Sequence, residues 1–346
     1  MQIAFTYNLR NSDAEEEAEF DLPETVEAIA SALRRAGHDV NLVEVSGPTS
    51  NLVARLEELS PDLIFNTAEG SHGRFREGFY PALFEQLGMP FTGSDAYVCT
   101  TTLDKRTTKM LLDAHGIPTP RWRFVDKVEQ LRGLSLRFPV IVKPNFEGSS
   151  KGITADSVAE DMEALTAKTS SLLEKYPMGI LVEEYITGRD LVVPFLSGAS
   201  PETGGILEPA VYNYRPEYVQ DKRFPVYDFA MKSSGFNAVS IQIPADISEE
   251  TRRNAMKMSD RVFRFLGIRD MGRVDFRVTE DGDLYFLEVN ALPSLEPGAS
   301  IYLAGALAGL ERMDQVLNTI VQSASERQHN AIPYPFVAAS EARARQ

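Results

Sequence analysis

The chain has 346 residues, of which 43% are hydrophobic, so it can bury a sizeable core and form two or three compact units. Its 50 acidic and 35 basic residues leave a net charge of -15, which argues against a surface that binds nucleic acid or an anionic membrane. A single cysteine, Cys99, excludes an internal disulfide, and the four histidines are too scattered for a zinc site.

The first residues, MQIAFTY, alternate like a strand and lack the basic segment and long apolar run of a signal peptide. No uncharged apolar run approaches the length that crosses a bilayer. We therefore expect a soluble, cytoplasmic protein that has neither a membrane nor a nucleic acid as its partner.

Predicted strands and helices alternate over the first 100 residues. The strands are expected at 2–7, 39–45, 62–68 and 89–94, and the helices at 23–36, 51–59 and 79–87. Strands separated by helices predict a parallel sheet with helical crossovers. Residues 7–10 and 69–76, which follow strand ends, would then line the crevice where such sheets bind ligands. No glycine-rich fingerprint follows the first strand, which argues against NAD.

Two further units are expected beyond residue 100. A helix over 103–116 and the prolines of IPTP form the connection, because a residue before proline favours extended backbone. After it come strands at 139–144, 179–186 and 189–196 and a helix at 157–175, and the last of these strands lies at the boundary with the third unit. The third contains strands at 206–214 and 239–245, a helix at 248–266, a hairpin at 274–290 and a helix from residue 301. We place the units at 1–100, 101–186 and 187–325, and the tail, 326–346, is either a peripheral helix or disordered.

The predicted hairpin carries acidic residues in both of its strands. Asp281-Gly282 predicts a two-residue type I′ turn. Counting outward from this turn puts Asp275 opposite Glu288, and Arg273 opposite Asn290. Because side chains alternate, these four project from one face of the hairpin. The other face carries Val274, Phe276, Leu287 and Val289.

Carboxylates that face each other across a strand pair repel unless something neutralises them. Arg273 can do part of this. A Mg²⁺ ion can do more, because Asp275, Glu288 and the amide of Asn290 are the oxygen ligands with which nucleotide-dependent enzymes bind it. The alternative interpretation is a solvated face on which these side chains point at water.

A lysine and a small polar loop precede the hairpin in the chain. Lys143 ends the strand at 139–144, and the loop EGSSKG follows it at 147–152. Its backbone N–H groups and hydroxyls are suited to cradling phosphates, although such loops are more often ordinary turns. The spacing of a Walker A motif is absent. The combination of this loop with Lys143 and the acidic hairpin favours a phosphate site.

Several ordered motifs resemble those of the ATP-grasp superfamily and, within it, the D-alanine:D-alanine ligase family. They are FTGS with LDKRTTK, PVIVKPNFEGSSKG, ILVEEYITGRDL, YDFAMK, GRVDF and LEVNALPSLEPGAS, spread over about residues 60–305. The resemblance implies an α/β fold of three parts, with a parallel-sheet N-terminal domain and with ATP held between two α+β domains. It leaves a homodimer open.

The resemblance also implies roles for the matching residues. The ATP contacts would be Lys105 and Lys143 at the α- and β-phosphates, Ser149 and Ser150 in the loop over the phosphates, Glu183 with the backbone of Glu184 and Ile186 at the adenine, and Asp190 at the ribose. The catalytic contacts would be Lys232 at the γ-phosphate, and Arg273 with a backbone N–H near Ser294 at the oxyanion. The metal ligands would be Asp275, Glu288 and Asn290, holding two Mg²⁺ ions for which Mn²⁺ can substitute.

The chain departs from the family pattern where substrates bind. Family members carry a glutamate after the first strand that holds the first amino group, and here Glu19 or Asp21 is the candidate. The stretch EGSHGRFREGF offers Glu69 and Arg76, and an arginine there suggests a carboxylate-bearing or larger substrate. In PSLEPGAS the substrate-contacting serine of the family is replaced by alanine, with Ser300 adjacent.

These features support one main functional hypothesis and two alternatives. The first is an ADP-forming carboxylate-amine ligase that uses ATP and Mg²⁺ and joins two amino acids, or an amino acid and a peptide, through an acyl phosphate. The alternatives are an ATP-binding regulatory module without ligation, and a kinase that forms an acyl phosphate. Because of the departures, substrates other than D-alanine are comparably supported.

Overall fold

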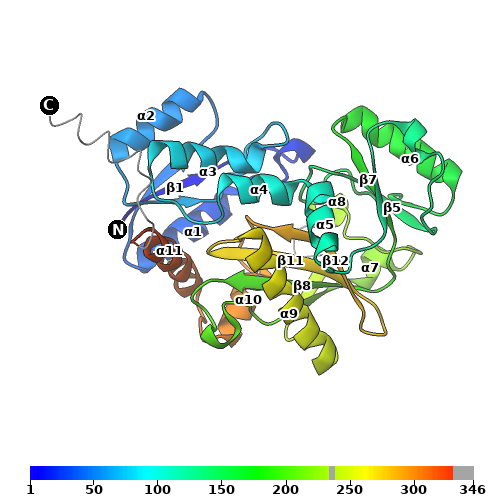
Figure 1. The fold of residues 1–346 in the computed structure, drawn as a ribbon. Coiled ribbons are helices and arrows are strands. Elements are labelled where there is room, and N and C mark those ends of the chain that lie inside the picture. Colours follow the sequence, from blue (N-terminus) through cyan, green and yellow to red (C-terminus); the bar gives the residue numbers. More distant parts are fainter. Residues whose placement is uncertain (234–237, 330–346) are drawn as a thin grey trace.

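The described part of the chain is built around three β-sheets (Figure 1). The computed structural model describes residues 1–233 and 238–329. In Figure 1 the N-terminal sheet lies on the left in blue, the second sheet on the right in green, and the largest sheet between and below them. Within the described residues, no helix is both long enough and apolar enough to cross a membrane. The predicted unit boundaries stay predictions.

The N-terminal sheet is parallel, as predicted, with the strand order β2-β1-β3. Its strands are β1 (Gln2–Tyr7), β2 (Asp39–Glu44) and β3 (Leu63–Asn66). One face is covered by α1 (Pro23–Arg35) and α11 (Met313–His329), and the other by α2 (Thr49–Leu59) and α3 (Arg76–Leu87). Because side chains alternate along β1, Ile3 and Phe5 pack in the first layer and Ala4 in the second.

Two predictions at the edges of this unit were wrong or incomplete. The strand expected at 89–94 is reduced to one isolated bridge between Ile64 and Phe91, and Pro90 beside it has no N–H to extend a ladder. The C-terminal helix α11 returns to the N-terminal sheet, where Val316 and Ile320 are fully buried. This helix includes residues 326–329, so the predicted tail begins as helix, and residues 330–346 lie outside the described residues.

The second sheet is antiparallel, with the strand order β4-β7-β5-β6. Its strands are β4 (Trp122–Val125), β5 (Val140–Pro144), β6 (Val158–Ala159) and β7 (Ile180–Glu184), and α6 (Met162–Lys175) packs on it. The helix predicted at 157–175 starts later, because β6 pairs with β5 and the Asp161 carboxylate caps the helix by accepting from the Ala164 N–H.

The connection between the first two units contains two helices rather than one. They are α4 (Ala96–Leu103) and α5 (Lys105–Ala114). Asp104 separates them, and its carboxylate accepts from the Thr107 N–H at the start of α5. Lys105 and Lys109 therefore lie one turn apart on the buried side of α5.

The third sheet is antiparallel, with the strand order β10-β9-β8-β11-β12. Its strands are β8 (Arg189–Leu196), β9 (Ala210–Tyr214), β10 (Val239–Gln242), β11 (Met271–Val278) and β12 (Leu284–Asn290). Its helices are α9 (Glu249–Leu266) and α10 (Ser300–Leu307), and α7 (Pro216–Val219) and α8 (Phe229–Ser233) lie in the long connection before β10. The strand at 189–196 belongs to this sheet and not to the second unit, because β8 pairs with β9 and β11.

The hairpin β11-β12 has the predicted register at Asp275 and Arg273, but its turn differs from the predicted one. Thr279 and Asp283 close a three-residue loop, with Gly282 at φ +87, so the predicted two-residue turn is wrong. A loop one residue longer shifts the pairing by one position, and a β-bulge between Asp275 and Phe276 reverses this shift. Asp275 consequently pairs with Glu288, and Arg273 with Asn290, as predicted.

Leu287 is the extra residue of the β-bulge. It has no partner on β11, because Phe276 pairs with Phe286 and the next pair is Asp275 with Glu288. Leu287 was expected on the apolar face of the hairpin with Val274, Phe276 and Val289, but it is absent from the core cluster that contains these three and Phe286, and it lines the cavity described below. A bulge turns two successive side chains toward one side of a sheet, which explains the change of face.

Candidate active site

A cavity of about 400 Å³ lies between the second and third sheets and is closed on one side by the N-terminal segment around residues 18–22. All the residues predicted for the site line this cavity except Arg76 and Ser300. Ser300 is buried, with its side chain hydrogen-bonded to Tyr212. Arg76 lies just behind the wall, where it binds a residue that does line the cavity.

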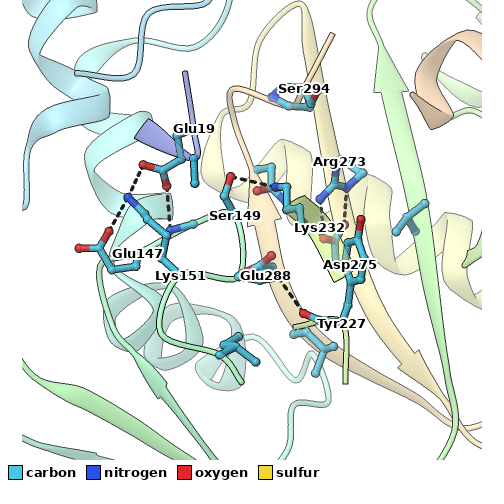
Figure 2. A pocket seen from close by; sticks show the side chains of 18 of the residues that line it. Glu19, Glu147, Ser149, Lys151, Tyr227, Lys232, Arg273, Asp275, Glu288 and Ser294 are labelled. Carbon is cyan, nitrogen blue, oxygen red and sulfur yellow. Dashed lines mark hydrogen bonds and ion pairs between the residues drawn. The ribbon is translucent and has the colours of Figure 1, made fainter. Parts of the chain in front are cut away.

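The acidic hairpin forms one wall of the cavity (Figure 2). Arg273 donates to both oxygens of Asp275, over 2.6 and 2.7 Å. The amide of Asn290 lies 3.4 Å from Asp275, and the Lys105 ammonium lies 3.4 Å from Glu288. Burial raises the pKa of Asp275 more than Arg273 lowers it, whereas Lys105 and Lys143 hold the pKa of Glu288 below its usual value despite burial.

This donor set is suited to a divalent cation. Two carboxylates and an amide oxygen converge from paired strands, and they are hard oxygen ligands of the kind that Mg²⁺ prefers. The raised pKa of Asp275 indicates that its negative charge is not fully compensated by Arg273. Asp275, Glu288 and Asn290 are therefore the residues that would hold the metal.

Lys143 is held in the cavity by a buried glutamate. Glu183, which is 1% exposed, forms ion pairs of 2.7 Å with both Lys143 and Lys109. Lys109 is fully buried and also donates to the Thr119 hydroxyl and the Phe286 carbonyl. Burial lowers the pKa of Lys109 to about 8. Glu183 was predicted at the adenine, and its carboxylate here orients Lys143. The partner Lys109 was missed, although its spacing from Lys105 was visible in the sequence.

The strand ends next to Glu183 are held by a second buried cation. Arg277 forms an ion pair with Asp190 and donates to the Ile186 carbonyl over 3.0 Å. The Tyr214 hydroxyl also hydrogen-bonds Asp190. Arg277 thus orders the Ile186 backbone, which was predicted to contact adenine, and the Asp190 carboxylate, which was predicted to contact the ribose. Arg277 was not predicted for the site, although alternation along β11 places it on the face of Arg273 and Asp275.

The loop at 147–152 lies over the cavity. Ser149 and Ser150 have φ values of 51 and 58, the left-handed region that non-glycine residues seldom occupy. Contacts hold them there: the Lys232 ammonium donates to the Ser149 hydroxyl over 2.8 Å, and the Ser150 hydroxyl donates to the Tyr227 carbonyl over 2.8 Å. Burial and the nearby Arg273 lower the pKa of Lys232. Figure 2 shows Lys232 between this loop and Arg273.

An ionic cluster joins this loop to the N-terminal unit. Glu19 receives hydrogen bonds from Arg76, from Lys151 and from the Gly148 amide. Burial would raise the pKa of Glu19, but Arg76 and Lys151 outweigh it and lower the pKa to about 2. Glu69 lines the same side of the cavity, and burial together with Glu19 raises its pKa well above the usual value.

Asp21, the other candidate for binding an amino group, is in a different environment. Its carboxylate accepts one hydrogen bond from the Thr67 hydroxyl, 2.6 Å away. Burial raises the pKa of Asp21 to about 7, outweighing the hydrogen bond from Thr67, and Glu296 adds to the rise. Ser294 lies on the loop after β12, on the same side of the cavity as Arg273 (Figure 2).

We expect Asp21→Asn to stabilise the protein at alkaline pH. A carboxyl pKa that is higher in the folded state than in the unfolded chain contributes stability that is present at low pH and is lost as pH rises through the folded pKa. The gain of the variant should therefore be absent near about pH 4 and reach about 4 kcal/mol by about pH 8. Chemical denaturation at several pH values measures it, with the exposed Glu24→Gln as control. A gain that did not change with pH would contradict the raised pKa.

The three sheets and the cavity between them define an ATP-grasp ligase fold. The family described as D-ala D-ala ligase C-terminus matches residues 111–322. This chain belongs to the D-alanine–D-alanine ligase family, as its sequence motifs predicted.

Relatives and solved structures agree with this assignment. The D-alanine–D-alanine ligase of Aquifex aeolicus is 32% identical over 289 residues, which cover 83% of this chain and 90% of the relative. An uncharacterized protein of Sinorhizobium fredii, y4sG, is 28% identical over 309 residues, 87% of each chain. The Bacillus anthracis D-alanine–D-alanine ligase complexed with ATP superposes with a TM-score of 0.71 at 20% identity, over 96% of this chain and all of the other. The VanG D-Ala:D-Ser ligase of Enterococcus faecalis gives 0.70 at 18% identity, over 93% and 99%.

Proposed function

We propose that this protein is an ATP-dependent, ADP-forming ligase that joins the carboxylate of one amino acid or peptide to the amine of another. The observation that carries the proposal is that Lys143, Lys232 and Arg273 face the same cavity as the acidic hairpin. Cations suited to phosphate and a metal-binding wall thus surround one reaction space. Membership of the ligase family supports ligation over a regulatory module or a kinase.

The proposed reaction has two steps. An oxygen of the donor carboxylate attacks the γ-phosphorus of ATP, the bond from that phosphorus to the ADP oxygen breaks, and an acyl phosphate forms. The amine nitrogen of the second substrate then attacks the acyl carbon, and the bond from that carbon to the phosphate oxygen breaks. The products are an amide, inorganic phosphate and a proton.

The chain's own residues would position and stabilise these species. Lys143, held by Glu183, and Lys232, held at Ser149, would neutralise phosphate charge in a partly desolvated space. Arg273 would donate to the oxyanion that develops on the acyl carbon, because it lies on the cavity wall between Asp275 and the loop of Ser294. Mg²⁺, when bound at Asp275, Glu288 and Asn290, supplies further charge neutralisation and orients the phosphate oxygens.

The test is product mass spectrometry. Folded protein is incubated with ATP, Mg²⁺ and pooled D- and L-amino acids and dipeptides, and ADP is measured in parallel. We expect ADP together with a new mass equal to two substrates minus water, and neither in reactions that lack ATP or lack the pool. The absence of both from folded protein across the whole pool would refute ligation, and ADP with a stable acyl phosphate but no amide would favour the kinase.

The identity of the metal and the cellular location are also part of this proposal. We take Mg²⁺ as the metal, with two ions bound and Mn²⁺ able to replace them, because the donors are oxygens only. A cytoplasmic location is in keeping with the use of ATP and with the single free cysteine, Cys99. A homodimer stays a prediction.

A further inference from the structure

The carboxylate of Glu19 has no acceptor position left for a ligand. Arg76 contacts both of its oxygens, through Nη2 at 2.8 and 3.0 Å and through Nε at 3.2 Å. The Lys151 ammonium donates to Oε2 over 2.6 Å, and the Gly148 N–H donates to Oε1 over 2.9 Å. A carboxylate offers about four lone-pair positions, and these three groups already use them.

Lys151 stands where a bound ammonium group would stand. Its Nζ lies 2.6 Å from Glu19 and 2.6 Å from Glu147, so two carboxylates enclose it (Figure 2). The side chains of Glu19 and Lys151 are 3% and 7% exposed, so water screens this pair weakly. The ammonium group of Lys151 thus occupies the position between two carboxylates that would suit the ammonium group of a substrate.

This filled site lies beside the place of phosphate transfer. Lys151 follows Ser149 by two residues in the loop over the cavity, and Ser149 is the contact of Lys232. Both Glu19 and Lys151 line the cavity at this end. When the carboxylate of a donor reaches the γ-phosphate, the group on the carbon next to that carboxylate therefore lies near Lys151.

A free ammonium group on the donor would meet unfavourable charges at this point. It would lie against the two cations that already neutralise Glu19, or it would have to displace Lys151 from two ion pairs. The neighbouring acids Glu69 and Glu77 are already offset by the same cations: burial raises the pKa of both, that of Glu77 to about 7, and Arg76 and Lys151 act to lower it. An uncharged amide avoids this penalty, and its carbonyl is an acceptor for the third N–H of Lys151.

We propose that the donor whose carboxylate is activated carries no free ammonium beside that carboxyl, and that it is an N-acylated amino acid such as the C-terminal residue of a peptide. The proposal rests on the proposed ligase function and specifies its donor. Lys151 and Arg76 are then specificity-determining residues, because they neutralise Glu19 and exclude free amino acids.

The experiment separates donor activation from the choice of amine. Hydroxylamine replaces the amine: its nitrogen attacks the acyl phosphate, phosphate leaves, and a hydroxamate forms. Wild-type protein with ATP and Mg²⁺ is given each donor in two forms, as the free amino acid and as its N-acetyl derivative, in D and L series, together with dipeptides. ADP and hydroxamate are measured. We expect kcat/KM for the N-acylated form of the accepted donor to exceed that of the free form by on the order of 100-fold.

The charge-removing variant is Lys151→Met. It frees the acceptor position on Oε2 of Glu19 that Lys151 occupies, so the preference for the N-acylated form should fall by at least roughly 10-fold even if the overall rate also drops. The ratio is taken within one protein sample, which makes it independent of the folded fraction. Lys175→Met, which removes a half-exposed lysine paired with Glu15 at the outer side of the second unit, is the matched control and should leave the ratio unchanged.

The outcomes are distinct. Equal or better use of free amino acids by the wild type would overturn this inference and leave the ligase function standing. An unchanged ratio in Lys151→Met would remove Lys151 as its cause. No ADP and no hydroxamate with any donor, while the Aquifex aeolicus relative is active with D-alanine under suitable conditions, would refute the proposed function itself.

Discussion

Glu288→Gln is expected to lower the rate of ADP formation by on the order of 100-fold to 1000-fold, and Asp275→Asn should do the same. Each replacement removes one negative charge from the wall that would hold Mg²⁺ and leaves a neutral oxygen of nearly the same shape. Since Asp275 and Glu288 are a cross-strand pair, neither carboxylate can take over the geometry of the other.

The measurement is steady-state ADP release over a range of Mg²⁺ concentrations. The variants should need more Mg²⁺ for half-maximal rate. Relief of the repulsion between the two carboxylates offsets part of the lost ion pairs with Arg273 and Lys105, so both variants should remain folded at the assay temperature, which thermal unfolding checks. Glu280→Gln, an exposed carboxylate in the loop of the same hairpin, is the control and should retain wild-type activity. Wild-type rates in both site variants would eliminate the metal role.

The second large effect is expected on stability. Glu183→Gln should lower the free energy of unfolding by about 3 to 5 kcal/mol, because it leaves Lys109 and Lys143 without their shared counter-charge. Affinity for ATP should fall as well, since Lys143 is no longer held toward the cavity. Chemical denaturation and nucleotide titration measure the two losses.

A double-mutant cycle makes this prediction sharper. Lys109→Met should be close to neutral or destabilising in the wild type, where Glu183 keeps Lys143 as a partner, but stabilising in the Glu183→Gln background, where it removes an unpaired buried charge. Glu184→Gln is the matched control, because its partners Arg121 and Arg137 are 59% and 82% exposed, and it should cost less than about 1 kcal/mol. Additive effects of the two replacements would argue against a coupled triad.

Much of the site was predictable because it depends on local sequence. The alternation of β11 and β12 by itself placed Arg273, Asp275 and Glu288 together, and the motif order placed the lysines and the serine loop beside them. The hairpin shows the limit of such counting. The predicted turn was one residue too short, and the register was still correct only because a bulge at Leu287 compensated for it.

The residues that were missed lie in networks between distant segments. Lys109 and Glu183 are 74 positions apart in the numbering, and Arg277 and Asp190 are 87 apart. Nothing in either local pattern reveals the partner, since a buried lysine or arginine on an amphipathic element looks like an exposed one. The same holds for α11, which was not predicted as a separate helix and which packs on the N-terminal sheet.

The sequence by itself determined the fold class, the parallel N-terminal sheet and the family, because hydrophobic periodicity and ordered motifs are local properties of the chain. Only the tertiary structure decided which charges are free to bind a ligand. Glu19 and Asp21 were equal candidates for an amino group in the sequence. In the folded protein Glu19 is neutralised by Arg76 and Lys151, from two other segments, whereas Asp21 accepts one hydroxyl hydrogen bond. Folding brings cationic side chains from distant segments next to a carboxylate. Whether that carboxylate can bind a ligand therefore depends on the three-dimensional arrangement.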